Sequence, residues 1–437
     1  MNRVLSYFLI TSLVLTSCKD DENGTSGLPG TSSTHPNILL IIADDMGIDA
    51  CPGYSEGSVK PNMPHLEELI RNGVTYDNVW AYPLCAPTRA SILTGKHGYN
   101  TGVLNVTTHN NLSESETTIQ RYLDQNTSKR YAHAIFGKWH LSNDANSATN
   151  MGVGTYAGLL RGALSNYNEW SFTENGTTNT YTGYATTKFT DLAINWINDQ
   201  SKPWFCWLAY TTPHTPFHLP PGEMHSQGSL PEDQASIDQN PQPYFMAMIE
   251  SLDYELGRIK DSLSQAEWDN TLIVFIGDNG TLRSVIQNPF GQRQGKGTIY
   301  QGGVNVPMIV SGSGVTRSNE HDASLICSTD LFATIASIAG VDVNTYEDSY
   351  SFSKTFTQAG AGVREYAYTE QATTDFPNQF TVRNDRYKLV QFDDTQREFY
   401  DLEADAYEKA DLLQGNLSND QQAALTALEA EANRIRQ

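Results

Sequence analysis

Cys85 is the residue of this chain whose surroundings most clearly suggest chemistry, because a proline and an arginine follow it at positions 87 and 89. The next residues, Ala-Ser-Ile-Leu-Thr-Gly, predict the first turns of a helix, and Pro87 suits a helix start because no hydrogen bond is lost there. A cysteine at such a start lies beside aligned backbone N–H groups and near the Arg89 guanidinium, in a place that favours anionic species. The spacing alone fits a cysteine nucleophile and equally a structural cysteine under a tight turn.

Oxygen-bearing side chains follow two apolar runs of the chain. Residues 37–43 and 271–276 are continuously apolar and rich in β-branched residues, as expected of strands buried on both faces. Each run leads into a polar pair, Asp44 with Asp45 and Asp278 with Asn279. Either pair alone also marks an ordinary turn. Together, at the carboxyl edge of a sheet, they form a hard-ligand set for calcium or magnesium, and their mutual repulsion calls for a cation.

Basic side chains lie in three further motifs. Lys138 and His140 belong to Gly-Lys-Trp-His and lie on the same side if the segment stays extended. His214 stands between two prolines, which stiffen its loop, although a lone histidine on a loop is more often a surface residue. Lys296 lies in a glycine-rich stretch that lacks the ending and spacing of a P-loop.

Strand and helix patterns alternate along most of the chain. Helices are expected at 63–72, 115–124, 250–263 and 328–339, and further strands at 131–136 and 204–210. This alternation predicts an α/β fold, a three-layer sandwich around a large, mainly parallel sheet. Short strands at 366–369, 380–383, 387–392 and 398–402, followed by a helix at 418–436, predict a small C-terminal antiparallel sheet plus helix. The expected domains are 36–345 and 346–437.

From residue 37 to about 413 the motifs resemble, in order, the formylglycine-dependent sulfatases, the Cys-type branch of the alkaline-phosphatase-like superfamily. The stretch around Cys85 fits Cys-x-Pro-x-Arg-x-x-x-Leu-Thr-Gly at every fixed position. In that family a maturation enzyme oxidises this cysteine to formylglycine. One hydroxyl of its hydrate attacks sulfur and the other later expels sulfate, so both half-steps are easy. The resemblance implies a sulfuric ester hydrolase that releases inorganic sulfate.

The resemblance also implies a role for each motif. The implied catalytic residues are Cys85, Arg89, Lys138, His140, His214 and Lys296. The implied metal ligands are Asp44, Asp45, Cys85, Asp278 and Asn279, around Ca²⁺ with Mg²⁺ as second choice. In the family pattern Arg89 would steady the formylglycine, Lys138 would bind the nucleophile and the sulfate, and His140 would assist sulfate elimination. His214 and Lys296 contact the ester and can protonate its leaving oxygen. The chain departs from the family at Gln301 and Asn305, where Glu and Arg are frequent, so details of loop packing or of a subsite are open.

The expected substrate is a sulfated carbohydrate. The formal net charge of -22 over 437 residues argues against nucleic acid as a partner, because phosphate binding needs clustered Lys and Arg. Asn105 and His109, soon after the signature helix, are predicted substrate contacts. Aromatic residues that could stack on sugars, or simply pack, are Tyr82, Tyr99, Trp139 and Trp170.

The N-terminus predicts export. Arg3 precedes an apolar run at 4–15 that is short for a transmembrane span, and the segment 1–18 ends in a sequence that resembles a bacterial lipobox. Cys18 would then be lipidated, and 19–35 would be a flexible tether. The expected location is the outer membrane, facing the cell surface, with the periplasm as alternative. The alternative is a plain secretory peptide with an incidental cysteine, and the lipobox is the interpretation that we favour. Cys206 and Cys327 are expected to be buried thiols.

Two other functions are compatible with these residues. Related folds support phosphodiester or phosphonate monoester hydrolysis by a similar mechanism. The other function is that of a catalytically silent surface lipoprotein that binds glycans. The presence of the complete set of implied catalytic residues argues against it.

Overall fold

The computed structural model describes residues 35–437. The predicted signal peptide, the predicted lipidation site Cys18 and nearly all of the predicted tether lie outside the described residues. No helix within residues 35–437 combines the length and the apolar character needed to cross a membrane.

A ten-stranded sheet forms the centre of the described chain. Its strands are β1 (Asn37–Ala43), β2 (Gly73–Trp80), β3 (Ala132–Lys138), β4 (Thr155–Leu159), β5 (Glu169–Glu174), β6 (Thr177–Thr182), β7 (Trp204–Ala209), β8 (Thr271–Gly277), β9 (Met308–Gly312) and β10 (Glu320–Cys327). Their order is β10-β2-β9-β8-β1-β7-β3-β4-β5-β6. The five neighbours from β8 to β4 are all parallel, whereas β9 and β5 run against the strands beside them. The prediction of a mainly parallel sheet is confirmed.

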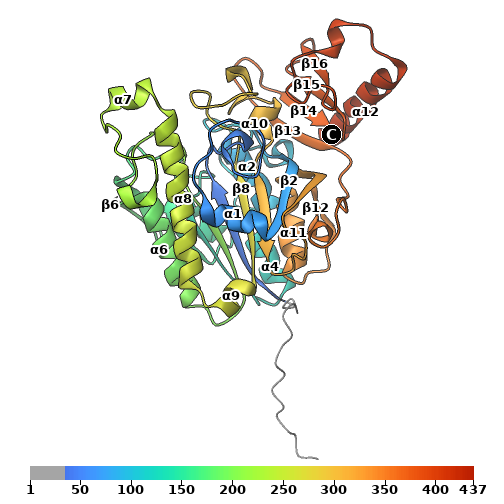
Figure 1. Cartoon of the computed structure of the whole chain (residues 1–437). Helices are drawn as coiled ribbons and strands as arrows, with labels where there is room; N and C mark the ends of the chain where they lie inside the picture. The colour runs from blue at the N-terminus through green and yellow to red at the C-terminus, as the bar shows by residue number, and fades with distance from the viewer. Residues whose placement is uncertain (1–34) are drawn as a thin grey trace, which may run out of the picture. The chain divides into compact units, whose positions relative to one another are not determined.

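Helices cover both faces of this sheet (Figure 1). One face packs against α1 (Pro64–Arg71), α6 (Ala185–Asn198) and α8 (Gln242–Ser262), and the other against α2 (Cys85–Thr94), α4 (Ile119–Asn126) and α11 (Asp330–Ile338). Within β1, Leu39 and Ile41 join the first core, while Ile38 and Leu40 join the second. Burial on both faces explains why this strand is apolar at every position. The three-layer architecture is therefore confirmed.

Shorter elements connect these layers. The short helices are α3 (Gly98–Thr101), α5 (Ser147–Asn150), α7 (Gln234–Gln239), α9 (Gln265–Asp269) and α10 (Gln301–Val304). The 3₁₀ turns are η1 (Ile48–Ala50), η2 (Gly222–Met224), η3 (Gln292–Gln294), η4 (Ser353–Phe356) and η5 (Leu412–Gln414).

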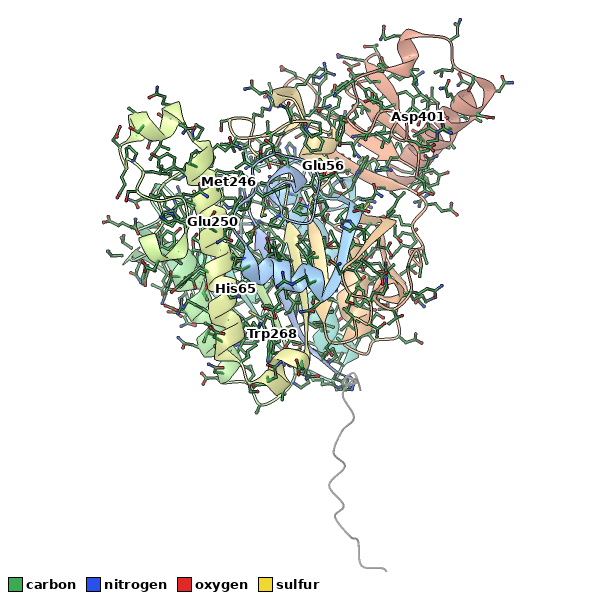
Figure 2. All side chains as sticks on the ribbon, in the orientation of Figure 1. Glu56, His65, Met246, Glu250, Trp268 and Asp401 are labelled. Carbon is green, nitrogen blue, oxygen red and sulfur yellow. The ribbon has the colours of Figure 1, made fainter. Side chains whose placement is uncertain are left out.

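Helix α8 is longer than its sequence pattern predicts. It begins at Gln242, eight residues before the expected start at 250, and a proline in its first turn fits that start. Met246 and Glu250 therefore lie one turn apart on the same helix, and His65 of α1 lies beside it (Figure 2). The Asp253 carboxylate accepts the backbone N–H of His65 at 3.1 Å and so satisfies a free donor at the start of α1.

The C-terminal part forms a second, smaller sheet, drawn in red in Figure 1. Its antiparallel strands are β13 (Ala367–Gln371), β14 (Gln379–Arg383), β15 (Tyr387–Gln391) and β16 (Arg397–Asp401), and a two-stranded hairpin, β11 (Thr345–Tyr346) with β12 (Ser349–Tyr350), precedes them. Helix α12 (Asn419–Ile435) covers the sheet with Leu425, Leu428 and Ala432. The antiparallel sheet plus helix is confirmed, while the boundary near residue 345 stays a prediction.

Candidate active site

Four oxygen-bearing side chains meet at the carboxyl edge of the large sheet. Strands β1 and β8 are parallel neighbours in register along their length, so the residues that follow them lie side by side. The backbone N–H of Asp45 donates to Asp278 Oδ1 at 3.1 Å, and Asn279 Nδ2 donates to Asp45 Oδ1 at 2.8 Å. All four side chains, Asp44 included, are at most 1% exposed. The structure thus brings together the predicted acidic pairs.

Helix α2 brings Cys85 to this cluster. Cys85 is its first residue, and the Thr88 hydroxyl donates to the backbone carbonyl of Asp278 at 2.7 Å. The buried Arg89 guanidinium donates to Asp278 Oδ2 and to the Lys138 carbonyl, both at 2.8 Å. Burial and a neighbouring carboxylate raise the pKa of Asp278 to about 7. The first turn of α2 is therefore hydrogen-bonded both to the end of β3 and to the residue that follows β8.

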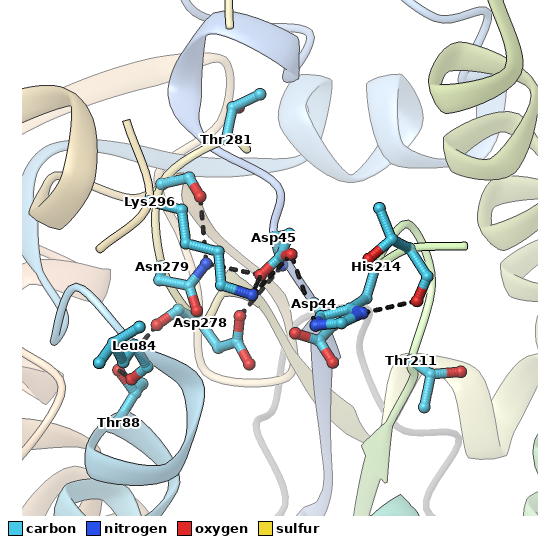
Figure 3. A network of polar contacts seen from close by, with 12 residues as sticks. Asp44, Asp45, Leu84, Thr88, Thr211, His214, Asp278, Asn279, Thr281 and Lys296 are labelled. Carbon is cyan, nitrogen blue, oxygen red and sulfur yellow. Dashed lines mark hydrogen bonds and ion pairs between the residues drawn. The ribbon is translucent and has the colours of Figure 1, made fainter. Parts of the chain in front are cut away.

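Two lysines neutralise the carboxylates. Lys138 Nζ lies 2.5 Å from Asp44 Oδ2, with both side chains fully buried. Lys296 Nζ lies 2.6 Å from Asp45 Oδ1 and keeps 12% of its side chain exposed. Figure 3 shows Asp45 between Lys296 and His214. Burial favours the neutral form of Asp45, but these two neighbours outweigh it and hold the pKa of that carboxyl below its usual range.

The loop that carries His214 is held by hydrogen bonds from the Tyr167 hydroxyl. Tyr167 donates its hydroxyl to the carbonyls of Thr211 and His214, each at 2.7 Å. His214 Nδ1 lies 2.7 Å from the Thr215 carbonyl, so this nitrogen carries a proton and donates to that carbonyl. The other ring nitrogen then faces Asp45 at 3.8 Å. Sequence reasoning missed Tyr167, which no motif marks.

His140 departs from the simple strand geometry. β3 ends at Lys138, and His140 has a φ of +62°, so the two side chains do not follow the alternation of an extended strand. Its ring lies against Gly162, where an added Cβ would come within 2.4 Å of the imidazole. Burial, and then the nearby Lys138, lower the pKa of His140.

The donor set fits a hard cation. Asp44 Oδ1 and Asn279 Oδ1 are buried and make no hydrogen bond within residues 35–437. Ligand atoms of Asp44, Cys85 and Asp278 lie within 4.8 Å of one another. Orphaned oxygens in a carboxylate cluster are what a calcium or magnesium ion would satisfy. Burial raises the pKa of the Cys85 thiol, which disfavours a thiolate here.

The predicted substrate contacts lie in a loop of their own. Asn105 Oδ1 accepts the backbone N–H groups of Thr107, Thr108 and His109 at 2.9–3.0 Å, so the amide shapes this loop. The role of Asn105 and His109 toward substrate stays a prediction. Of the aromatic residues considered for sugar stacking, Tyr82, Trp139 and Trp170 are buried, and Tyr99 is 44% exposed.

The glycine-rich loop is held by the C-terminal part through an ion pair that sequence reasoning missed. Lys388 Nζ lies 2.5 Å from Glu408 Oε1 and donates to the Ile299 carbonyl at 2.9 Å. Glu408 Oε2 accepts the N–H of Gln301 at 2.6 Å. A lysine inside an apolar strand is a signal for such a pair, but its partner cannot be read from the sequence. Both loop residues lie within five positions of Lys296.

All four cysteines within residues 35–437 are free and buried, as expected for Cys206 and Cys327. Gln301 accepts from the Trp80 indole at 3.0 Å, and Asn305 donates to the Asp77 carbonyl at 3.0 Å. These two departures from the family pattern therefore take part in loop packing.

Two family models match the chain. The model described as Sulfatase matches residues 36–341, and the one described as N-sulphoglucosamine sulphohydrolase, C-terminal, matches residues 293–435. Arylsulfatase J of Mus musculus is 25% identical over 77% of this chain, which spans 58% of that relative's length. Arylsulfatase G of Rattus norvegicus is 26% identical over 82% of this chain and 76% of its own length.

A solved structure has the same fold. The crystal structure of Ps i-CgsB in complex with k-i-k-neocarrahexaose superposes with a TM-score of 0.77 and 22% identity, and the match covers 92% of this chain and 94% of that chain.

Proposed function

This chain belongs to the sulfatase family of sulfuric ester hydrolases, and from that membership we propose that it hydrolyses sulfate esters of a carbohydrate. The proposed nucleophile is a formylglycine made from Cys85, and the proposed cofactor is Ca²⁺. The observation that carries the proposal is the convergence of Cys85 with three fixed cations and four oxygen donors at one sheet edge.

The residues present fit both absent groups. Asp44, Asp45, Asp278 and Asn279 would hold the cation, which would supply Lewis-acid stabilisation of charge on the ester oxygens. Formylglycine at position 85 would supply a hydrated aldehyde, with one hydroxyl for attack and one for release.

The chain's own side chains then divide into two groups. Arg89 and Lys138 are fully buried and hold fixed positive charge beside position 85, where it stabilises the sulfuryl oxygens. Lys296 and His214 keep 12% and 15% of their side chains exposed, so an ester that enters from solvent meets them first. We assign these two to binding the ester and to delivering a proton to its leaving oxygen. Tyr167 positions the His214 loop for this contact.

The carbohydrate part of the proposal is supported by likeness to Ps i-CgsB, whose structure contains neocarrahexaose. The hydroxyl-rich surface beside the site, described below, also suits a sugar. A fixed set of cations binds any tetrahedral oxyanion, so phosphonate or phosphate esters are the alternative substrates.

The test compares three aryl esters. Protein co-expressed with a formylglycine-generating enzyme is assayed with Ca²⁺ on para-nitrophenyl sulfate, para-nitrophenyl phosphate and bis(para-nitrophenyl) phosphate, and mass spectrometry measures conversion of Cys85. We expect the highest kcat/KM on the sulfate and its loss in Cys85→Ala, which should unfold at the wild-type temperature. Preference for a phosphorus ester would select the alternative. Equal rates for wild type and Cys85→Ala would overturn the proposed nucleophile.

A further inference from the structure

Arg161 is a cation beside the candidate active site that forms no ion pair with any of residues 35–437. It lies in the loop after β4, at the carboxyl edge of the sheet, because β4 runs parallel to β3. Its side chain is exposed, and among the described residues it forms no ion pair. An unpaired cation at this edge is notable in a chain with a formal net charge of -22.

The backbone of this loop is fastened to a catalytic candidate. The N–H of His140 donates to the Leu160 carbonyl at 3.0 Å. On the other side of Arg161, Gly162 lies so close to the His140 ring that a Cβ there would reach 2.4 Å from it. Arg161 is thus held at a fixed place next to His140, between two residues that touch it.

Two adjoining cavities share Arg161. The smaller, of about 240 Å³, is lined by His140 and Ser142 as well, and the larger, of about 410 Å³, extends away from it. Both are also lined by Asn143 and Leu160, so the two cavities adjoin, and we name them together the Arg161 cavity. His140 lines the smaller cavity, so the Arg161 cavity includes the ring of this histidine at one end.

The larger cavity has the lining of a sugar site. Its polar lining consists of Asn143, Ser165, Ser171, Thr173 and Thr178, and its apolar lining includes Leu159, Leu164 and the buried Trp170. The hydroxyls of Thr173 and Thr178 bond each other at 2.7 Å, which leaves Asn143, Ser165 and Ser171 as the other polar side chains of this lining. Hydroxyl and amide groups pair with sugar hydroxyls, whereas a guanidinium binds sulfate or carboxylate oxygens in bidentate fashion.

We propose that the Arg161 cavity is a subsite for a second anionic group, a sulfate or carboxylate on the sugar next to the one that is desulfated, and that Arg161 binds it. This inference rests on the proposed function. It assigns to the enzyme a glycan with anionic substituents on adjacent sugars, and Arg161 selects that glycan over a singly charged ester.

The test measures preference for a polyanion. On wild type, Arg161→Ala, Arg161→Lys and Arg71→Ala we would measure KM with para-nitrophenyl sulfate as substrate and Ki with sucrose octasulfate as inhibitor, with sucrose as the uncharged probe. Arg71 is the matched control, since it is an exposed arginine at the end of α1, before β2 and hence at the opposite edge of the sheet. In Arg161→Ala the ratio of Ki to KM should rise about 10- to 100-fold, the usual effect of losing a charged hydrogen bond. In Arg161→Lys the ratio of Ki to KM should rise less than in Arg161→Ala, because a positive charge is kept. In Arg71→Ala the ratio should equal the wild-type value.

The same change in ratio for Arg161→Ala and Arg71→Ala would overturn the subsite. If no protein hydrolyses para-nitrophenyl sulfate, the proposed function fails, and calorimetric Kd values for sucrose octasulfate decide the subsite separately. A Kd that rises in Arg161→Ala, less in Arg161→Lys and not in Arg71→Ala supports the subsite, and a Kd common to all four proteins refutes it.

Discussion

Exchanging Glu408 for glutamine tests how the C-terminal sheet holds Lys296 in the active site. The Lys388–Glu408 pair is fully buried, and each partner also bonds a backbone group of the loop that carries Lys296. The Lys388 ammonium also lies 4.8 Å from the centre of the Trp80 ring, and Glu408 is its ion-pair partner. Glutamine keeps the shape of the side chain and removes only its charge.

The expected loss follows from burial. Removing one partner of a buried ion pair costs about 3–5 kcal/mol, because the other charge stays uncompensated. Burial lowers the pKa of Lys388 to about 8 even with its partner present. We therefore expect Glu408→Gln to lower the free energy of unfolding by about 3 kcal/mol at pH 7. A displacement of Lys296 near 1 Å would lower kcat by up to about 100-fold.

Urea unfolding at 25 °C and kcat on para-nitrophenyl sulfate measure the two effects. The matched control is Glu429→Gln, the same substitution in an exposed pair with Arg397 of the same sheet, which should cost less than about 1 kcal/mol. The double variant Lys388→Met/Glu408→Gln should recover stability without recovering kcat. Equal urea midpoints for Glu408→Gln and Glu429→Gln would refute the energetic argument. A destabilised Glu408→Gln that keeps its full kcat while folded would refute the positioning role.

Two further predictions concern the cation and a buried histidine. Removing divalent ions with a chelator should lower both the melting temperature and the activity, and Ca²⁺ at 100 times its Kd should restore about 2.7 kcal/mol in wild type but less in Asn279→Ala. An unaltered melting curve would contradict the cation site. His97 is 2% exposed, and burial lowers its pKa to about 4, below the unfolded value of 6.5. Its contribution to stability is therefore complete above pH 6.5 and is lost as the pH falls toward 4, by at most about 3 kcal/mol. Urea unfolding of His97→Gln should lack this pH dependence, and identical slopes in both proteins would contradict it.

The strands and residue pairs that build the site were predictable for a simple reason. A strand buried on both faces must be apolar throughout, so β1 and β8 stand out, and polar residues at their ends mark the sheet edge. The apolar pattern does not show that β1 and β8 are direct neighbours, because sheet order depends on contacts between segments more than 200 residues apart; the joint ligand set of the two polar pairs is what placed them together. The positive φ of His140 is likewise set by its surroundings and leaves no trace in composition.

Other elements escaped prediction because they lack an apolar pattern. β6 is an edge strand that is exposed at nearly every position, so its sequence lacks the alternation of apolar and polar residues that marks a strand, although its threonines favour strand structure. With β5 it forms the hairpin that carries part of the Arg161 cavity. The surface that would distinguish one substrate from another thus lies in the part of the sheet that sequence patterns describe least.

The charge of the cluster gives a reason for the cation that is independent of family likeness. Three carboxylates, Asp44, Asp45 and Asp278, face three fixed cations, Arg89, Lys138 and Lys296, so the side chains alone are formally balanced. A balanced cluster gives an anionic ester little net attraction, and the acidic surface of the chain opposes its approach. A divalent cation leaves the cluster two charges positive, and one sulfate monoester still leaves it positive. Chelation should therefore weaken ester binding as well as stability, and an anion-binding subsite next to the site adds attraction where the rest of the surface supplies repulsion.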